Sequence, residues 1–166
     1  MMQYPRTIRN FNAFVDGVSY AGRVLEGKLP ELKMQTASHR GGGMDGPVAV
    51  DMGMEAMQAE LTLAEWPPEL IKMFGTRQRM TLRPGAMGEH DFSADSYVGT
   101  LGGRWSVTNF GDLKSGSDVP LKLTLEVDYF RMLKDGDELF EIDIEAGKRI
   151  IGGVDQLAEL RAAMGF

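Results

Sequence analysis

The chain has 166 residues, no cysteine, and a formal net charge of −6. This length fits one domain that buries about two-thirds of the surface its unfolded form would expose, so folding requires neither a disulfide nor a metal. The absence of cysteine excludes thiol nucleophiles, thiolate metal sites and disulfide frameworks, and the negative charge argues against a surface that grips nucleic acid.

The first ten residues, MMQYPRTIRN, do not have the pattern of a secretory signal. They lack an apolar stretch, and the longest apolar runs of the chain fall far short of the roughly 20 residues needed to span a membrane. We therefore expect a soluble protein that assembles in a reducing cytosol.

The first predicted element is a β-hairpin over Asn12–Tyr20. Asp16-Gly17 lies there between apolar and aromatic residues, which is the strongest short-range signal for a two-residue hairpin turn.

A glycine-rich segment follows at Arg40–Met54, with the sequence RGGGMDGPVAVDMGM, and runs into a short apolar strand. Its clustered glycines permit positive backbone dihedrals at a high entropic cost to folding. The segment lacks the lysine of a phosphate-binding GxxxxGK[ST] loop and the spacing of a dinucleotide fingerprint. It is therefore interpreted as a connector whose entropic cost a partner surface offsets, with an ordinary surface turn as the alternative.

Gly53–Leu63 is ambiguous. Met54, Met57 and Leu61 fit a helical stripe, whereas every second residue from Met57 to Leu63 is apolar, as in a strand. Propensity alone favours a helix.

Pro67–Gly75 is predicted as a short helix, because prolines suit its first turn and Gly75 suits its C-cap. Leu70, Ile71 and Phe74 would share one face.

Three segments in which apolar and polar residues alternate then predict strands with one buried and one solvent-exposed face. They are Arg77–Arg83, the stretch in which Leu101, Gly103, Trp105 and Val107 alternate with polar residues, and Leu121–Leu133. In the last of these, Leu121, Leu123, Leu125, Val127 and Tyr129 share the apolar face, and Lys122, Thr124, Glu126 and Asp128 share the polar face. The turn Lys134–Asp137 and the return strand Glu138–Ile144 complete a second hairpin.

The final element is an amphipathic helix over Val154–Met164, with Leu157, Leu160 and Met164 on one stripe, Asp155 near its start and Gly165 at its end.

Residues that could carry chemistry are few. His39 and His90 each stand alone in sequence, and their neighbours are typical of polar loops. The acidic run over residues 135–145 lacks the DxDxDG order of a calcium loop and straddles the second hairpin. The sequence therefore predicts no catalytic residue, no metal site and no cofactor. A carboxylate-dependent hydrolase with a pair of buried acids stays open as an alternative.

A set of short segments, spread over nearly the whole chain, points to one family. In chain order they are Asn12–Gly22, Leu29–Leu32, Arg40–Val48, Asp51–Met57, Tyr129–Phe130, Glu141–Asp143, Gly153–Leu157 and the terminal Gly165-Phe166. In this order and at these spacings, the chain resembles the major tail tube protein of contractile-tailed phages of the P2-like type and of the related R-type pyocin tubes.

The resemblance implies a mainly β (α+β) fold, a β-sandwich or barrel with one short internal helix and a C-terminal amphipathic helix, in a single tail tube domain over residues 1–166. It implies a strand at Gly53–Leu63, where pairing overrides propensity. It also implies that residues 40–54 form a flexible loop that reaches the adjacent ring. The inter-ring contact would comprise Arg40, Gly41, Gly42, Gly43, Met44, Asp45, Gly46 and Pro47. The lumen-facing candidates are Lys122, Thr124, Glu126 and Asp128.

By the same resemblance the chain is a structural subunit without enzymatic activity. Its hexameric rings would stack into a hollow tube inside a contractile sheath, in a virion tail assembled in the cytoplasm of the host bacterium. Expected partners are further copies of the chain, the tail sheath protein, baseplate and tail terminator proteins, and a tape measure protein in the lumen. DNA, or ions in a bacteriocin, would pass without tight binding, because an acidic wall offers no cationic clamp. The alternative is a tube subunit of a type VI-like secretion system or another contractile injection system.

Overall fold

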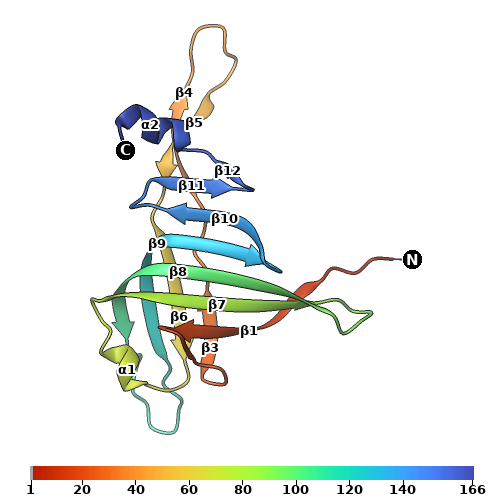
Figure 1. Ribbon diagram of the computed structural model, residues 1–166. Coiled ribbons are helices and arrows are strands. Elements are labelled where there is room, and N and C mark those ends of the chain that lie inside the picture. The colour runs from red at the N-terminus through yellow and green to blue at the C-terminus, as the bar shows by residue number, and fades with distance from the viewer. Residues whose placement is uncertain (1) are drawn as a thin grey trace.

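A computed structural model describes residues 2–166 and shows a β-rich body from which a two-stranded arm projects (Figure 1). The strands are β1 (Thr7–Val15), β2 (Val18–Ser19), β3 (Val24–Lys28), β4 (Met34–His39), β5 (Val48–Met54), β6 (Met57–Leu63), β7 (Arg77–Met87), β8 (Ala94–Asn109), β9 (Leu121–Lys134), β10 (Asp137–Asp143), β11 (Lys148–Ile151) and β12 (Val154–Asp155). The helices are α1 (Pro68–Ile71) and α2 (Ala158–Met164). This composition confirms the predicted mainly β fold with a short internal helix and a C-terminal helix.

One antiparallel sheet forms the body. Its main path runs β12-β11-β10-β9-β8-β7-β1-β2, and β6, with β3 beside it, joins at β9. The first half of β9, Leu121–Val127, pairs with β6, and the second half, Tyr129–Lys134, pairs with β10. Because β9 changes partner midway, the sheet turns over on itself into two layers. In Figure 1 the strands from β7 to β12 cross in front of β3 and β6.

The bend between the layers depends on Gly103. The register of β8 on β9 shifts between Gly102, which faces Tyr129, and Gly103, which faces Val127, so Asp128 forms a bulge. A Cβ atom on Gly103 would lie 1.9 Å from the carbonyl oxygen of Glu126, so only glycine permits this approach of the two backbones.

The bulge corrects one prediction for β9. Tyr129 does not share the apolar face of Leu121 and Leu125, because the extra residue at Asp128 reverses the alternation beyond it. Phe130 is buried in its place. A second irregularity between Trp105 and Val107 has the same effect on β8, where Val107 is exposed and not part of the apolar face.

The core fills the space between the two layers. Its largest fully buried side chains are Val15, Tyr20, Leu61, Leu63, Met80, Leu101, Trp105, Leu121, Leu123, Leu125, Phe130 and Ile142. They come from the apolar faces of both halves of the sheet. Burial of this kind is worth about 1.5–3 kcal/mol for each large side chain, which makes the core the main source of stability.

Both predicted hairpin turns are confirmed. Asp16 and Gly17 have φ values of 50° and 78°, and Asp135 and Gly136 have values of 49° and 88°. Two consecutive positive φ values fit a two-residue turn whose twist matches that of the flanking strands.

The ambiguous segment Gly53–Leu63 is extended, as the resemblance implied, and lies in β5 and β6. In β6 the side chains at Met57, Ala59, Leu61 and Leu63 are buried, and those between them are not. Pairing with β3 and β9 outweighs the helix propensity of this segment.

Both helices are shorter than predicted. Only Pro68–Ile71 is helical within Pro67–Gly75, and Phe74 is exposed instead of sharing the buried face of Leu70. Near the C-terminus, Val154–Asp155 is strand β12, and the helix begins at Ala158. Gly165 ends it with a left-handed φ of 75°, as predicted. None of the helices within residues 2–166 is long and apolar enough to cross a membrane.

Candidate assembly interface

The arm projects from the body (Figure 1) and consists of β4, the tip Arg40–Pro47 and β5. The two strands pair from Met34 with Met54 to His39 with Val48. Figure 1 shows the arm passing behind β10 and β11 and extending beyond the body. The predicted loop is therefore shorter than residues 40–54, because Val48–Met54 forms the apolar strand that the sequence also indicated.

All eight residues of the predicted inter-ring contact lie together at this free end. The tip folds on itself, because the Met44 N–H donates to the Gly41 carbonyl (3.3 Å) and the Gly41 N–H approaches the Met44 sulfur (3.1 Å). Gly43 has a φ of 81°, in the region that favours glycine, whereas Gly42 does not have a positive φ. The tip is thus a compact turn with a single residue, Gly43, at positive φ.

The arm carries uncovered apolar side chains. Val48, Val50 and Met52 alternate along one face of β5 and are 49%, 42% and 60% exposed, and Met34 on β4 is 44% exposed. Isolated two-stranded hairpins are at best marginally stable in water. An apolar stripe on such a hairpin indicates a surface that another molecule covers.

A buried arginine of β11 holds the arm against the body. Arg149 is 6% exposed, and its guanidinium binds the carboxylate of Asp51 on β5. The hydrogen bond from Arg149, followed by one from the Gly53 N–H (2.9 Å), lowers the pKa of Asp51 below its usual value. Sequence reasoning missed Arg149, and no local signal could have found it, since 98 residues separate the two partners.

The four lumen-facing candidates lie along β9 in three different environments. Lys122 pairs with Glu60 of β6 (3.3 Å), and Glu126 accepts hydrogen bonds from Gln58 (2.7 Å) and Ser106 (3.2 Å). Thr124 is only 9% exposed and so presents little surface. The last candidate, Asp128, lies at the bulge.

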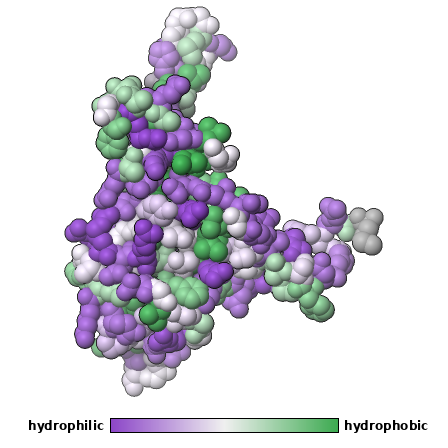
Figure 2. Space-filling view, viewed as in Figure 1, coloured by the Kyte–Doolittle hydropathy of each residue, from purple (hydrophilic) through white to green (hydrophobic). Residues whose placement is uncertain are grey.

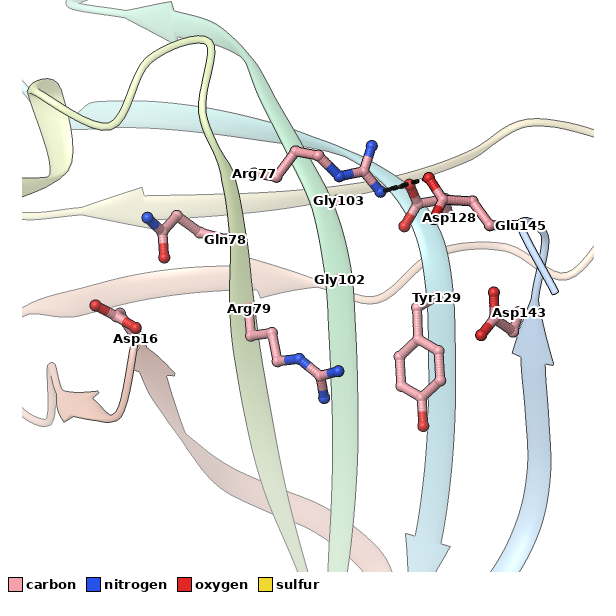
Figure 3. A pocket seen from close by; sticks show the side chains of 10 residues that line it. All are labelled: Asp16, Arg77, Gln78, Arg79, Gly102, Gly103, Asp128, Tyr129, Asp143 and Glu145. Atoms are coloured by element: carbon pink, nitrogen blue, oxygen red, sulfur yellow. Dashed lines mark hydrogen bonds and ion pairs between the residues drawn. The ribbon is translucent and has the colours of Figure 1, made fainter.

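Asp128 lines a hollow of about 390 Å³ on the outer face of the sheet. Figure 3 shows Arg77 reaching across β8 near Gly103 toward Asp128 and Glu145. Arg77 forms ion pairs with both carboxylates, the one to Glu145 measuring 3.2 Å. The hollow exists because two successive glycines leave β8 without side chains there.

A cation–π contact joins two further residues of the hollow. The guanidinium of Arg79 lies 5.4 Å from the centre of the Tyr129 ring. Partial burial, followed by the charge of Glu141, raises the pKa of Tyr129. Its ion pairs join Arg77 to Asp128 and Glu145, and its described side chains include no nucleophile with an adjacent base.

The structure offers no support for the hydrolase alternative. That alternative requires a pair of buried acids, and no aspartate or glutamate within residues 2–166 is buried. His90 packs against the Tyr4 ring at 5.2 Å, and His39 ends β4. The part of the chain that the structure describes holds no group of three or more histidines and acids arranged to bind a metal.

The sheet has strand edges with no partner in the monomer, at β2, β3 and β12. Near β12 the helix α2 has no buried residue. Figure 2 shows hydrophobic side chains around the base of the arm, over β11, β12 and α2, above a mostly hydrophilic body. The exposed apolar residues of this region are Ile144, Ile151, Val154, Leu160, Met164 and Phe166.

Open sheet edges, uncovered apolar surface and a projecting arm together define a subunit built for assembly, because such edges invite pairing with another chain. Solved structures share this fold. The chain is similar to one in the cryo-EM structure of an extracellular contractile injection system, the PVC sheath-tube complex in the extended state. The TM-score is 0.59 at 12% identity, over 78% of this chain and 92% of the other. A chain of the PVC sheath/tube terminator in the extended state gives a TM-score of 0.61 at 11% identity, over 80% and 99%.

Sequence comparisons identify the family. The chain is 29% identical to the tail tube protein of Escherichia phage P2 over 99% of this chain and 100% of that protein. It is 31% identical to the major tail tube protein of Serratia phage KSP20 over 86% and 85%. The family model of the phage tail tube protein FII matches residues 5–165. The chain therefore belongs to the phage tail tube protein FII family, and its role is that of a tail tube subunit.

Proposed function

We propose that the chain forms hexameric rings that stack into the hollow inner tube of a contractile phage tail, through which DNA passes. The observation that carries this proposal is the arm, a hairpin with apolar side chains open to solvent on a chain of the tail tube family. In a monomer such a hairpin buries little apolar surface, and its apolar side chains would be buried only on assembly. The protein acts through the complementary surfaces by which its copies assemble, and not by catalysis.

Within a ring, the open strand edges supply the lateral contacts. The outer edge of β3 and the edges at β2 and β12 can pair with edges of neighbouring subunits. Closing a sheet around a ring removes every edge and leaves no template for aggregation.

Between rings, the tip Arg40–Pro47 provides the contact. It lies at the end of the arm, which extends beyond the body (Figure 1), and the Asp51–Arg149 pair joins the arm to β11. A directed arm loses less conformational freedom on stacking than a loose loop would.

The polar face of β6 and β9 forms the lumen wall, with Lys122, Glu126 and Asp128 as its charged candidates and Thr124 contributing little. Lys122 and Asp128 are each paired with an opposite charge, and Glu126 is hydrogen-bonded. Such a wall has no cluster of free cations and so does not clamp phosphate. DNA and a tape measure protein can then occupy the lumen without tight binding.

Further partners are the tail sheath protein, the tail terminator and the baseplate, in a virion assembled in the host bacterial cytoplasm. The fold shared with chains of a sheath-tube complex and of a sheath/tube terminator supports the first two. The same likeness favours a second candidate, the tube of a contractile injection system without a genome. An image of the native particle, with or without a DNA-filled head, separates the two.

Assembly tests the proposal. Purified protein at rising concentration, with and without sheath protein, is followed by light scattering and negative-stain microscopy. We expect rings and tubes that appear above a threshold concentration. Monomers alone at every concentration and with sheath present would contradict the proposal.

A further inference from the structure

The end of the molecule opposite the arm carries a second uncovered apolar surface, here called the end patch. It consists of Trp66, Ile71, Phe74, Phe110 and Leu113, from α1 and the segments beside it. Phe74 is 59% exposed and Leu113 is 79% exposed. Figure 1 shows α1 and the loop between β8 and β9 at one extreme of the body, with the arm tip at the other.

The end patch is preorganised. The Trp66 ring packs edge-on against Phe110 with 5.2 Å between ring centres, and its indole N–H donates to the Val119 carbonyl at 3.0 Å. Phe110 also lines, together with Ile71, Phe74 and Thr108, a hollow of about 340 Å³. A fixed and mainly apolar hollow of this size can receive aliphatic side chains with little loss of side-chain freedom.

Charges at the two ends complement each other. The arm tip carries Arg40 and Asp45, and the loop beside the end patch carries Asp112, Lys114 and Asp118. None of these five takes part in any of the ion pairs found within residues 2–166. The tip thus presents one cation and one anion, and the loop presents partners for both.

We propose that the end patch of one copy of the chain receives the arm of a second copy in the adjacent ring. Val48, the exposed apolar residue next to the tip, enters the hollow beside Phe74, and Arg40 and Asp45 pair with the charges of the loop over residues 111–118. The inference rests on the proposed stacking of rings. Stacking of identical rings is head-to-tail, so the surface at one end must match a different surface at the other.

Cross-linking tests this contact cleanly, because the chain has no cysteine of its own. Gly42→Cys is placed in the arm, where a Cβ meets nothing within 4 Å, and Ser115→Cys is placed in the exposed loop beside the end patch. Assembled tubes of the double variant are oxidised and run on a denaturing gel. We expect an open ladder that continues well beyond the six subunits of one ring, because each bond joins a ring to the next.

The control pairs Gly42→Cys with Phe92→Cys, a residue 96% exposed in the loop between β7 and β8, and each single variant is run beside it. These tubes should give no ladder. A ladder in the control pair but not in the Ser115→Cys pair, or a ladder that ends at one ring, would overturn the docking of arm on end patch while leaving the tube itself intact. If no variant and no wild-type protein forms tubes, the proposed function fails and this inference falls with it.

A substitution gives a second, independent readout. Phe74→Glu should raise the protein concentration at which tubes form by roughly tenfold or more, since a central aromatic anchor is lost. Its unfolding midpoint should not change, because Phe74 is outside the core. Phe92→Glu is the matched control and should assemble as the wild type does. Equal assembly of the two variants would also overturn the proposal.

Discussion

The body and the arm differ in strand pairing and in burial. In the body, strands such as β6 and β9 have a neighbour on both edges and bury one full face in a shared core. In the arm, β4 and β5 have only each other, and β4 has no buried residue at all. The body thus has a core of its own, whereas the arm is joined to it by the Asp51–Arg149 pair and by Met54 at the base of β5. The core residues lie in the body, whereas the arm presents its apolar side chains to solvent.

The largest effect on the stability of the monomer is expected in the body, at the bend. Gly103→Ala should lower the free energy of unfolding by about 3 kcal/mol, because the added Cβ meets backbone that cannot move aside. The Cβ would lie 1.9 Å from the Glu126 carbonyl oxygen. Urea unfolding followed by circular dichroism measures the change.

Gly85→Ala in β7 is the matched control. Its Cβ would have one neighbour, at an ordinary 4.0 Å, so the change should be within about 0.5 kcal/mol. Equal losses in the two variants would show that the close approach at Gly103 does not shape the bend.

The next effect is expected at the junction of body and arm. Asp51→Asn leaves the buried Arg149 without a counter-charge and should lower the unfolding midpoint at pH 7 by on the order of a few degrees. Hydrogen exchange of the amides of β5 should accelerate, because the arm loses its anchor. Asp45→Asn, at the tip and outside every ion pair found in residues 2–166, should change neither quantity.

The same pair predicts a pH dependence. The pKa of Asp51 is lowered in the folded protein, so the stabilisation is fully present above the unfolded pKa of about 3.9 and is lost as pH falls through the lower folded value. Protection of the β5 amides should therefore drop in acid below about pH 4 in the wild type. Asp51→Asn should abolish this drop in protection. The same drop in that variant would show that another titrating group causes it.

A smaller effect is expected on the proposed lumen face. Glu126→Lys removes the acceptor of Gln58 and Ser106 and places a cation opposite Arg104, a cost of about 1 kcal/mol or less. In assembled particles the new cation should slow DNA passage. Glu126→Gln is the control for lost charge alone, and Glu159→Lys on α2 is the control for a charge reversal elsewhere. Normal genome ejection with Glu126→Lys would place this face away from the lumen.

The smallest effect on the monomer is expected in the arm tip, where assembly suffers most. Gly43→Val should change the free energy of unfolding by less than about 1 kcal/mol, since the tip packs on no other part of the body. It should nevertheless shorten the tubes, because valine resists a φ of 81°. Gly42→Val is the matched control, with open space and no positive φ. Tubes of equal length in both variants would count against a role for the tip conformation.

Local signals predicted the elements whose determinants lie close together in sequence. Asp16-Gly17 and Asp135-Gly136 each contain the whole requirement of their turn, and both hairpins are found. The bulge at Asp128 is different, since it depends on Gly103 approaching the backbone of a strand more than twenty residues away. Strand alternation alone therefore placed Tyr129 on the wrong face.

The candidate interface, too, could be predicted only where its determinants lie close together in sequence. The glycines of the tip indicate the turn at the end of the arm, but nothing in sequence shows that Arg149 holds Asp51 or that Phe74 and Phe110 line one hollow at the far end. The same limit applies to Thr124, because the alternation along β9 predicts a solvent-exposed residue at this position. It is buried because the irregularity at Ser106 places Val107 opposite it in the sheet.

The most direct test of the tube proposal is a cryo-EM structure of the assembled wild-type protein. We predict stacked six-membered rings around an open lumen, with the tip Arg40–Pro47 of every subunit in contact with the adjacent ring. An assembly in which the arms contact only their own ring, or which does not stack, would contradict the proposal.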